Sequence, residues 1–137
     1  MSKDVTPTQR EFEILKVLWE RGEAPVRDVY EELRQHLPIV QNTVQAFLRT
    51  MEEKGLVRHR LEGRTFIYQP VQARQQTIQQ LAGQLLQRAF DGSINQLVQN
   101  VLELRTPTRE ELDSLEALIA QAKAKRGNTK DPRSKKP

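Results

Sequence analysis

Residues 41–70 read QNTVQAFLRTMEEKGLVRHRLEGRTFIYQP, and this stretch decides the fold that the sequence predicts. Its first half carries apolar residues at i, i+3, i+4 and i+7, the spacing of one helical face: Val44, Phe47, Leu48 and Met51. Gly55 is the expected end of this helix, because glycine readily takes the left-handed conformation. The second half predicts a short β-hairpin studded with arginines.

The predicted hairpin joins strands 56–61 and 64–68 through a two-residue turn at Glu62-Gly63. The pairs expected on one face are His59 with Phe66 and Val57 with Tyr68. Alternation places the other hairpin residues on the opposite face, which holds Arg58, Arg60, Thr65 and Ile67. Arg64 is then expected at the hairpin tip.

Two helices are predicted upstream of this stretch. Thr8 and Glu11 have the spacing of a capping box, and Gly22 ends the helix that they begin. A second helix follows Pro25 and stops before Pro38. The apolar stripes of the two helices are Phe12, Leu15, Leu18 and Trp19, then Val26, Val29, Tyr30, Leu33 and Leu37. Three helices followed by a hairpin is the order of a winged helix-turn-helix domain.

Three more striped helices follow Pro70, separated by the breaks at residues 91–93 and 106–107. Helices of this length do not easily cover one another's apolar faces, so we expect burial against a second copy of the chain. The residues expected at this dimer contact are Leu81, Leu85, Leu86, Phe90, Leu97, Val98, Val101, Leu102, Leu115, Leu118 and Ile119. The alternative is a three-helix bundle within one chain, or packing back onto the first domain.

The sequence thus predicts a mainly α fold with a small β-hairpin, organised in three parts. These are a winged-helix DNA-binding domain over residues 1–72, a helical dimerisation domain over 73–124 and a basic tail over 125–137. The net charge of +4 arises from the C-terminal end, because residues 1–72 carry 11 Lys/Arg against 11 Asp/Glu. We expect the tail to be disordered and to add at most salt-sensitive, non-specific attraction to phosphate.

Composition excludes several classes of protein. There is no cysteine, which removes disulfides, thiolate metal sites and cysteine nucleophiles. The two histidines, His36 and His59, lie far apart, and no glycine-rich phosphate loop or nucleophile elbow occurs. We therefore predict no enzyme activity, no metal and no cofactor. The polar N-terminus and the lack of an apolar run of about 20 residues predict a soluble protein of the bacterial cytoplasm, without membrane insertion.

Double-stranded operator DNA is the expected partner of the third helix and the hairpin. The residues predicted to contact DNA are Asn42, Thr43, Gln45, Ala46, Arg49 and Thr50 on the helix, and Arg58, Arg60 and Arg64 on the hairpin. Asn42 can pair with adenine, and Arg49 can contact guanine or phosphate. Glu52 and Glu53 would repel phosphate, so they are expected where the helix leaves the groove. The alternative is that these are ordinary solvated side chains.

The sequence resembles the penicillinase-repressor family, the BlaI, MecI and CopY type of bacterial repressors. The segments that carry the likeness span nearly the whole chain: TQREFEILKVLW at Thr8–Trp19, Thr43-Val44-Gln45, Glu53-Lys54-Gly55-Leu56, EGRTFIY at Glu62–Tyr68, and Phe90-Asp91-Gly92-Ser93 with Val98-Gln99-Asn100. The resemblance implies a winged helix, a dimer and a dyad-symmetric operator.

The resemblance also implies release from DNA in some members through a membrane sensor-protease or its effector. The bond that matches the family's cleavage site is Asn100–Val101, where the family usually has an aromatic residue after the asparagine. The copper-sensing branch of the family uses a cysteine-rich tail, which this chain lacks.

Two other functions compete with the repressor. The charge balance of residues 1–72 suits a protein–protein adaptor that uses the winged helix as a docking platform. The apolar helices could instead sense a small ligand between the domains.

Overall fold

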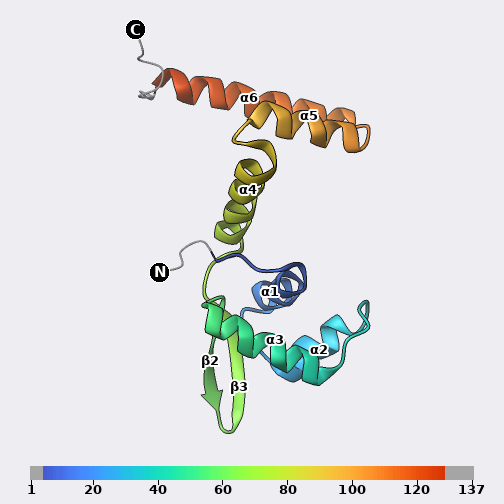
Figure 1. The fold of residues 1–137 in the computed structure, drawn as a ribbon, viewed down its shortest axis with the longest axis vertical. Coiled ribbons are helices and arrows are strands. Elements are labelled where there is room, and N and C mark those ends of the chain that lie inside the picture. The colour runs from blue at the N-terminus through green and yellow to red at the C-terminus, as the bar shows by residue number, and fades with distance from the viewer. Residues whose placement is uncertain (1–4, 129–137) are drawn as a thin grey trace. The chain divides into compact units, whose positions relative to one another are not determined.

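The computed structural model describes residues 5–128, which form six helices and three strands (Figure 1). In chain order these are α1 Gln9–Arg21, β1 Ala24–Pro25, α2 Val26–Leu33, α3 Gln41–Lys54, β2 Val57–Glu62, β3 Thr65–Pro70, α4 Arg74–Phe90, α5 Ile94–Leu104 and α6 Arg109–Asn128. The chain divides into two compact units, Met1–Ala89 and Phe90–Pro137. This division assigns nearly all of α4 to the first unit, whereas the functional boundary at residue 72 remains a prediction.

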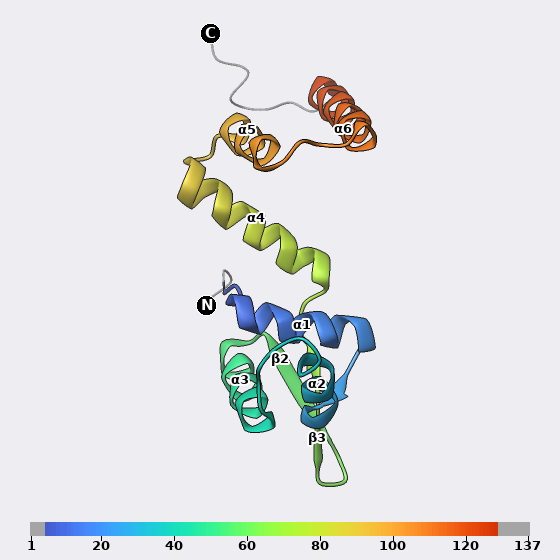
Figure 2. The same ribbon diagram turned by 90° about the vertical axis from the view of Figure 1, so that its right-hand side faces the viewer.

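The first unit is a winged helix, as predicted. Helices α1, α2 and α3 pack around an antiparallel sheet in the order β1-β3-β2, and the β2–β3 hairpin projects beyond them (Figure 2). Strand β1 is an addition to the predicted hairpin. It is two residues long and pairs Ala24 with Tyr68. The core is formed by Ile14, Leu15, Val17, Leu18, Ala24, Val29, Leu33, Val44, Leu48, Met51, Leu56, Val57 and Tyr68.

The first turn of α1 is tied to the end of α3 by a buried carboxylate. The Thr8 side chain caps the helix, and Thr8 N donates to Glu11 Oε1 at 2.9 Å, which confirms the capping box. The other oxygen, Glu11 Oε2, accepts from Lys54 Nζ at 2.8 Å. Glu11 is only 2% exposed. Because a buried charge is costly unless paired, these bonds hold α3 against α1.

The hairpin turn lies at Gly63-Arg64, so the predicted turn at Glu62-Gly63 and its pairing are wrong. His59 pairs with Tyr68, and the neighbouring pairs on the same face are Leu61 with Phe66 and Val57 with Pro70. Gly63 has φ +66°, and Arg64 has no positive φ. Two-residue hairpin turns need positive φ at the first central position, which glycine adopts without strain and glutamate does not. The pairing moves by two residues, so each side chain keeps its predicted face.

Within the first unit, polar contacts join α4 and the residues just before it to the N-terminal part of the chain. Trp19 Nε1 donates to the Gln72 carbonyl oxygen at 2.9 Å just before α4, and Thr6 Oγ1 donates to Gln84 Oε1 at 3.1 Å. Thr77 is buried on the same helix. Trp19 was predicted on a buried stripe, and it is half-buried, with its ring in a T-shaped contact with the ring of Phe12. Its indole N–H needs an acceptor, which explains why it stops at the surface of the core.

The second unit contains α5 and α6. Ser93 Oγ accepts from Gln96 N at 3.1 Å and caps α5, as predicted. Thr108 and Glu111 form the second predicted capping box, with both reciprocal bonds at 3.0 Å. Neither α5 nor α6, over their described residues, contains a buried side chain. Across residues 5–128, the helices are too short or too polar to cross a membrane.

Candidate nucleic-acid interface

Helix α3 presents a polar face to solvent while its other face enters the core. Val44, Leu48 and Met51 are buried, as the helical spacing predicts. All the residues predicted to contact DNA are exposed: Asn42, Thr43, Gln45, Ala46, Arg49, Thr50, Arg58, Arg60 and Arg64. Gly55 ends the helix in the left-handed conformation at φ 87°. The chain then turns directly into β2, which fixes the hairpin beside α3.

A hollow of about 470 Å³ lies between α3, the start of α2 and the hairpin. It brings together Gln45 and Arg49 of α3 with Arg64 of the hairpin turn. Its remaining lining among the described residues is Pro25, Val26, Arg27, Gln41, Glu52, Thr65, Phe66 and Tyr68. The other predicted residues of α3, which are Asn42, Thr43, Ala46 and Thr50, form an outer strip that does not line it. The predicted residues of α3 are therefore divided between two neighbouring surfaces, the hollow and the outer strip.

Three arginines line this hollow: Arg27, Arg49 and Arg64. None of them makes a hydrogen bond or an ion pair within residues 5–128. Arg27 is not among the residues that the sequence predicts at the DNA contact, because it lies on α2 and not on α3 or the hairpin. The sequence gives a weak indication of its role, because Arg27 does not lie on the apolar stripe of α2.

Arg60, in contrast, is already engaged. Its Nε and Nη2 donate to Glu23 Oε1 and Oε2 at 3.1 and 2.7 Å, a bidentate pair across the sheet. This hydrogen bonding lowers the pKa of Glu23 and raises that of Arg60. In the sheet register, Ile67 lies between Arg60 and Pro25. Arg60 and Arg58 therefore belong to the hairpin face opposite Phe66 and Tyr68, and neither lines the hollow.

A carboxylate–histidine pair joins α3 to the hairpin. Glu52 of α3 places both carboxylate oxygens 2.8 Å from His59 Nδ1 of β2. His59 stacks on Phe66 with ring centroids 3.9 Å apart and planes at 6°, beside Tyr68. Burial is the main cause that raises the pKa of Tyr68, and the nearby Glu52 charge also raises it. The Arg49 charge lowers it. Glu52 lines the hollow, but its charge is directed at the hairpin.

The residues predicted at the dimer contact are not buried within one chain. Leu85, Val98, Val101, Leu118 and Ile119 are exposed. The others, which are Leu81, Leu86, Phe90, Leu97, Leu102 and Leu115, are half-buried. Leu104 and Leu112 are exposed apolar residues of the second unit that the prediction omitted.

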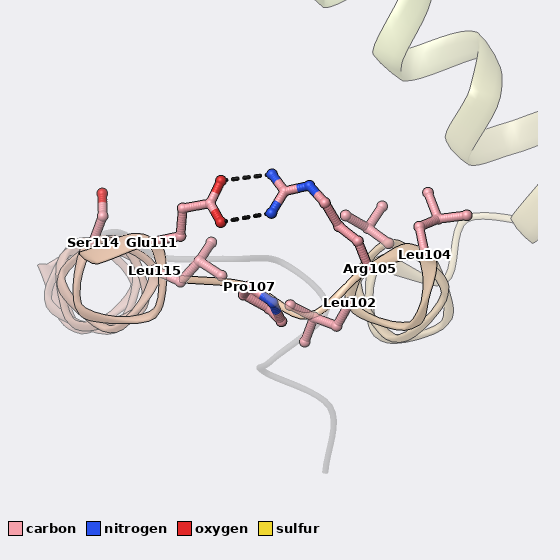
Figure 3. A pocket seen from close by; sticks show the side chains of 8 residues that line it. Leu102, Leu104, Arg105, Pro107, Glu111, Ser114 and Leu115 are labelled. Carbon is pink, nitrogen blue, oxygen red and sulfur yellow. Dashed lines mark hydrogen bonds and ion pairs between the residues drawn. The ribbon is translucent and has the colours of Figure 1, made fainter. Parts of the chain in front are cut away.

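A second hollow, of about 350 Å³, lies between α5 and α6 (Figure 3). Leu102, Leu104, Pro107 and Leu115 give it apolar walls. At one edge Arg105 donates two hydrogen bonds to Glu111, at 2.8 and 2.7 Å, and these bonds lower the pKa of Glu111 to about 2. Within residues 5–128, His, Asp and Glu side chains nowhere gather in a group of three that could hold a metal ion.

The bond Asn100–Val101 lies within α5. The Asn100 side chain donates through Nδ2 to the Gln96 carbonyl oxygen at 2.8 Å, one helical turn earlier. The bond is exposed but its backbone is helical.

A winged helix whose third helix turns a polar strip to solvent beside an arginine-bearing hairpin defines a class, the winged-helix transcription regulators. The sequence pattern of the penicillinase repressor family matches residues 7–121. The chain therefore belongs to the penicillinase repressor family, whose members are transcriptional repressors and not enzymes.

The chain is also similar to individual proteins. The penicillinase repressor of Bacillus licheniformis is 28% identical over 123 residues, covering 90% of this chain and 96% of the relative. The methicillin resistance regulatory protein MecI of Mammaliicoccus sciuri is 17% identical and covers 80% and 89%, respectively. The solved DNA-binding domain of the repressor BlaI is 30% identical, with a TM-score of 0.48, over 54% of this chain and 90% of that domain.

Proposed function

We propose that this protein is a homodimeric transcriptional repressor that binds a palindromic operator through α3 and the hairpin. The observation that carries the proposal is the exposed strip of Asn42, Thr43 and Ala46 beside arginines that have no carboxylate partner in the described chain. Short polar groups near the start of a recognition helix suit base edges in the major groove. Arginines left unpaired suit the charged backbone.

The dimer is supported by the second unit, where apolar side chains of α5 and α6 remain uncovered. Leu104 is 81% exposed and Ile119 is 55% exposed. Large apolar side chains left exposed in number are typical of an interaction site. A second copy is the partner we propose, because a twofold pair of winged helices also matches a palindromic operator.

Release from the operator is proposed to follow cleavage at Asn100–Val101 by a sensor-protease pathway. Proteases bind their substrates extended, and this bond is in a helical turn closed by the Asn100 to Gln96 hydrogen bond. Cleavage would therefore require local unwinding of α5, which is short and carries no buried side chain in the described structure. Cutting here would separate α6 from the winged helix.

The test of operator reading is Asn42→Ala, measured by fluorescence anisotropy on a dyad from upstream of the gene and on a scrambled duplex of equal length. We expect a loss of about 1–3 kcal/mol on the dyad and almost none on the scrambled duplex, because a base contact carries specificity. Equal binding of the variant and the parent to the dyad would remove Asn42 from the reading surface.

A protein–protein adaptor remains the competing function, because residues 1–72 carry no net charge. A salt titration separates the two. A DNA-binding repressor loses affinity for duplex steeply as salt rises, since bound counterions are released on association. A flat response, or no duplex binding at low salt, would favour the adaptor.

A further inference from the structure

We propose that Arg27 completes a phosphate-binding site with Arg49 and Arg64, and that the hollow between α2, α3 and the hairpin holds one backbone phosphate of duplex DNA. This inference rests on the proposed function and adds to it a contact from α2. It divides the DNA surface in two: the outer strip of α3 reads bases, and the hollow fixes the position of the backbone.

The three arginines come from three different elements. Arg27 lies at the second position of α2, Arg49 in the third turn of α3, and Arg64 in the hairpin turn after Gly63. All three line the same hollow. Elements so far apart in the sequence meet here because β1 pairs with β3, which sets the start of α2 beside the hairpin.

The charge of the hollow suits a phosphate. Its lining contains three guanidinium groups and one carboxylate, that of Glu52, which leaves a net charge of +2. Glu52 holds His59 with both oxygens, so its charge is committed to the hairpin. The arginines, in contrast, have no hydrogen-bonded acceptor within residues 5–128. Guanidinium groups bind phosphate oxygens in a planar, two-pronged geometry.

The size and lining of the hollow also suit a phosphate group. Its volume of about 470 Å³ accommodates a phosphate group with waters around it, since one water occupies about 30 Å³ in the liquid. Gln41 and Gln45 add amide donors along the α3 wall. Arg60 of the same hairpin differs from the arginines of the hollow, because it has a carboxylate within reach and donates to Glu23.

The first measurement compares Arg27→Gln with Arg74→Gln, which removes an equal charge from an exposed arginine at the start of α4 and outside the hollow. We expect Arg27→Gln to weaken binding about fivefold or more, by the same factor on the dyad and on a scrambled duplex. The slope of log K against log salt should become shallower by about 1–2 per dimer. Arg27→Lys should recover part of the loss, and unchanged unfolding of Arg27→Gln shows that the fold is intact.

The second measurement replaces single phosphates of the dyad by neutral methylphosphonates. At one position in each half-site, neutralisation should weaken the parent protein and cause a smaller loss in Arg27→Gln, Arg49→Gln or Arg64→Gln. The inference is overturned if the affinity losses from neutralisation and from substitution add fully at every position, or if Arg27→Gln and Arg74→Gln weaken binding equally. Either result leaves the repressor proposal intact. Failure of the parent to bind any duplex overturns both. Protection of the hollow by millimolar inorganic phosphate, with DNA binding of Arg27→Gln unchanged, would make it a free-anion site instead.

Discussion

The two units of this protein use the same sequence pattern with opposite outcomes. In the first unit the stripes of α1, α2 and α3 are covered, and Leu18 is 0% exposed. In the second, α5 and α6 carry stripes of the same spacing, yet Leu118 is 57% exposed. An apolar stripe therefore shows that a helix face needs a partner, and not where that partner is.

The difference has an energetic consequence. Burying a leucine side chain contributes about 1.5–3 kcal/mol relative to leaving it in water. The first unit gains this stabilisation from each of the apolar side chains buried in its core. The second unit depends on local features: the Ser93 cap, the Thr108–Glu111 capping box and the Arg105–Glu111 pair. We expect the first unit to fold independently and the second to gain stability on association.

The largest expected effect is that of Leu18→Ala in the core of the first unit. Removing a fully buried leucine side chain should lower the free energy of unfolding by about 2–5 kcal/mol. The fluorescence of Trp19, the one tryptophan of the chain, reports the unfolding of this unit during denaturant titration. Ile119→Ala is the control, and it should leave the Trp19 transition within about 0.5 kcal/mol of the parent. A comparable shift in both variants would show that the units unfold together.

Features of the fold that depend on residues close together in the chain can be predicted from the sequence, and those that depend on distant residues cannot. The capping boxes and the end of α3 at Gly55 were predicted correctly, because they depend on neighbours within four residues. The hairpin turn was placed one residue early, since the choice depends on which residue takes positive φ. Strand β1 was not predicted, because two residues without alternation give no periodic signal.

The same distinction between local and long-range interactions applies to the candidate site. The exposed positions of α3 follow from helical spacing, so the sequence predicts them. Arg27 enters the site, and Arg60 pairs with Glu23, through contacts between segments that lie far apart in the chain. Such pairings arise from the tertiary fold, and no local pattern encodes them.

The next effect in size concerns the uncovered stripe of the second unit. Leu118→Glu places a charge on it and should raise the dimer dissociation constant at least tenfold, because the charge would have to be desolvated on association. Sedimentation equilibrium measures this change. Ala117→Glu adds the same charge on the opposite side of α6 and should leave the dimer intact. Equal dissociation in both variants, or none in either, would place the dimer contact elsewhere.

A smaller effect is expected at the wing, where Arg60 is paired with Glu23 and Arg64 has no hydrogen-bonded or ion-paired partner among residues 5–128. Glu23→Gln removes the carboxylate that binds Arg60 and should tighten duplex binding about two- to threefold at low salt. The gain should fade as salt screens the charges. Glu20→Gln, an equal charge change on the exposed side of α1, is the control. If both variants tighten binding equally, the gain reflects net charge and not the release of Arg60.

The smallest effect is a pH dependence confined to the second unit. Hydrogen bonding by Arg105, then by the Thr108 backbone, lowers the pKa of Glu111 from 4.5 to about 2. A carboxyl group whose pKa is lowered by folding adds stability that is present above its unfolded pKa and is lost as pH falls from about 4.5 through about 2. NMR titration of the Glu111 carboxyl should show a midpoint near 2 that moves toward 4.5 in Arg105→Gln, and Arg109→Gln should leave it in place. An unmoved midpoint in Arg105→Gln would show that capping alone, without the ion pair, holds the first turn of α6.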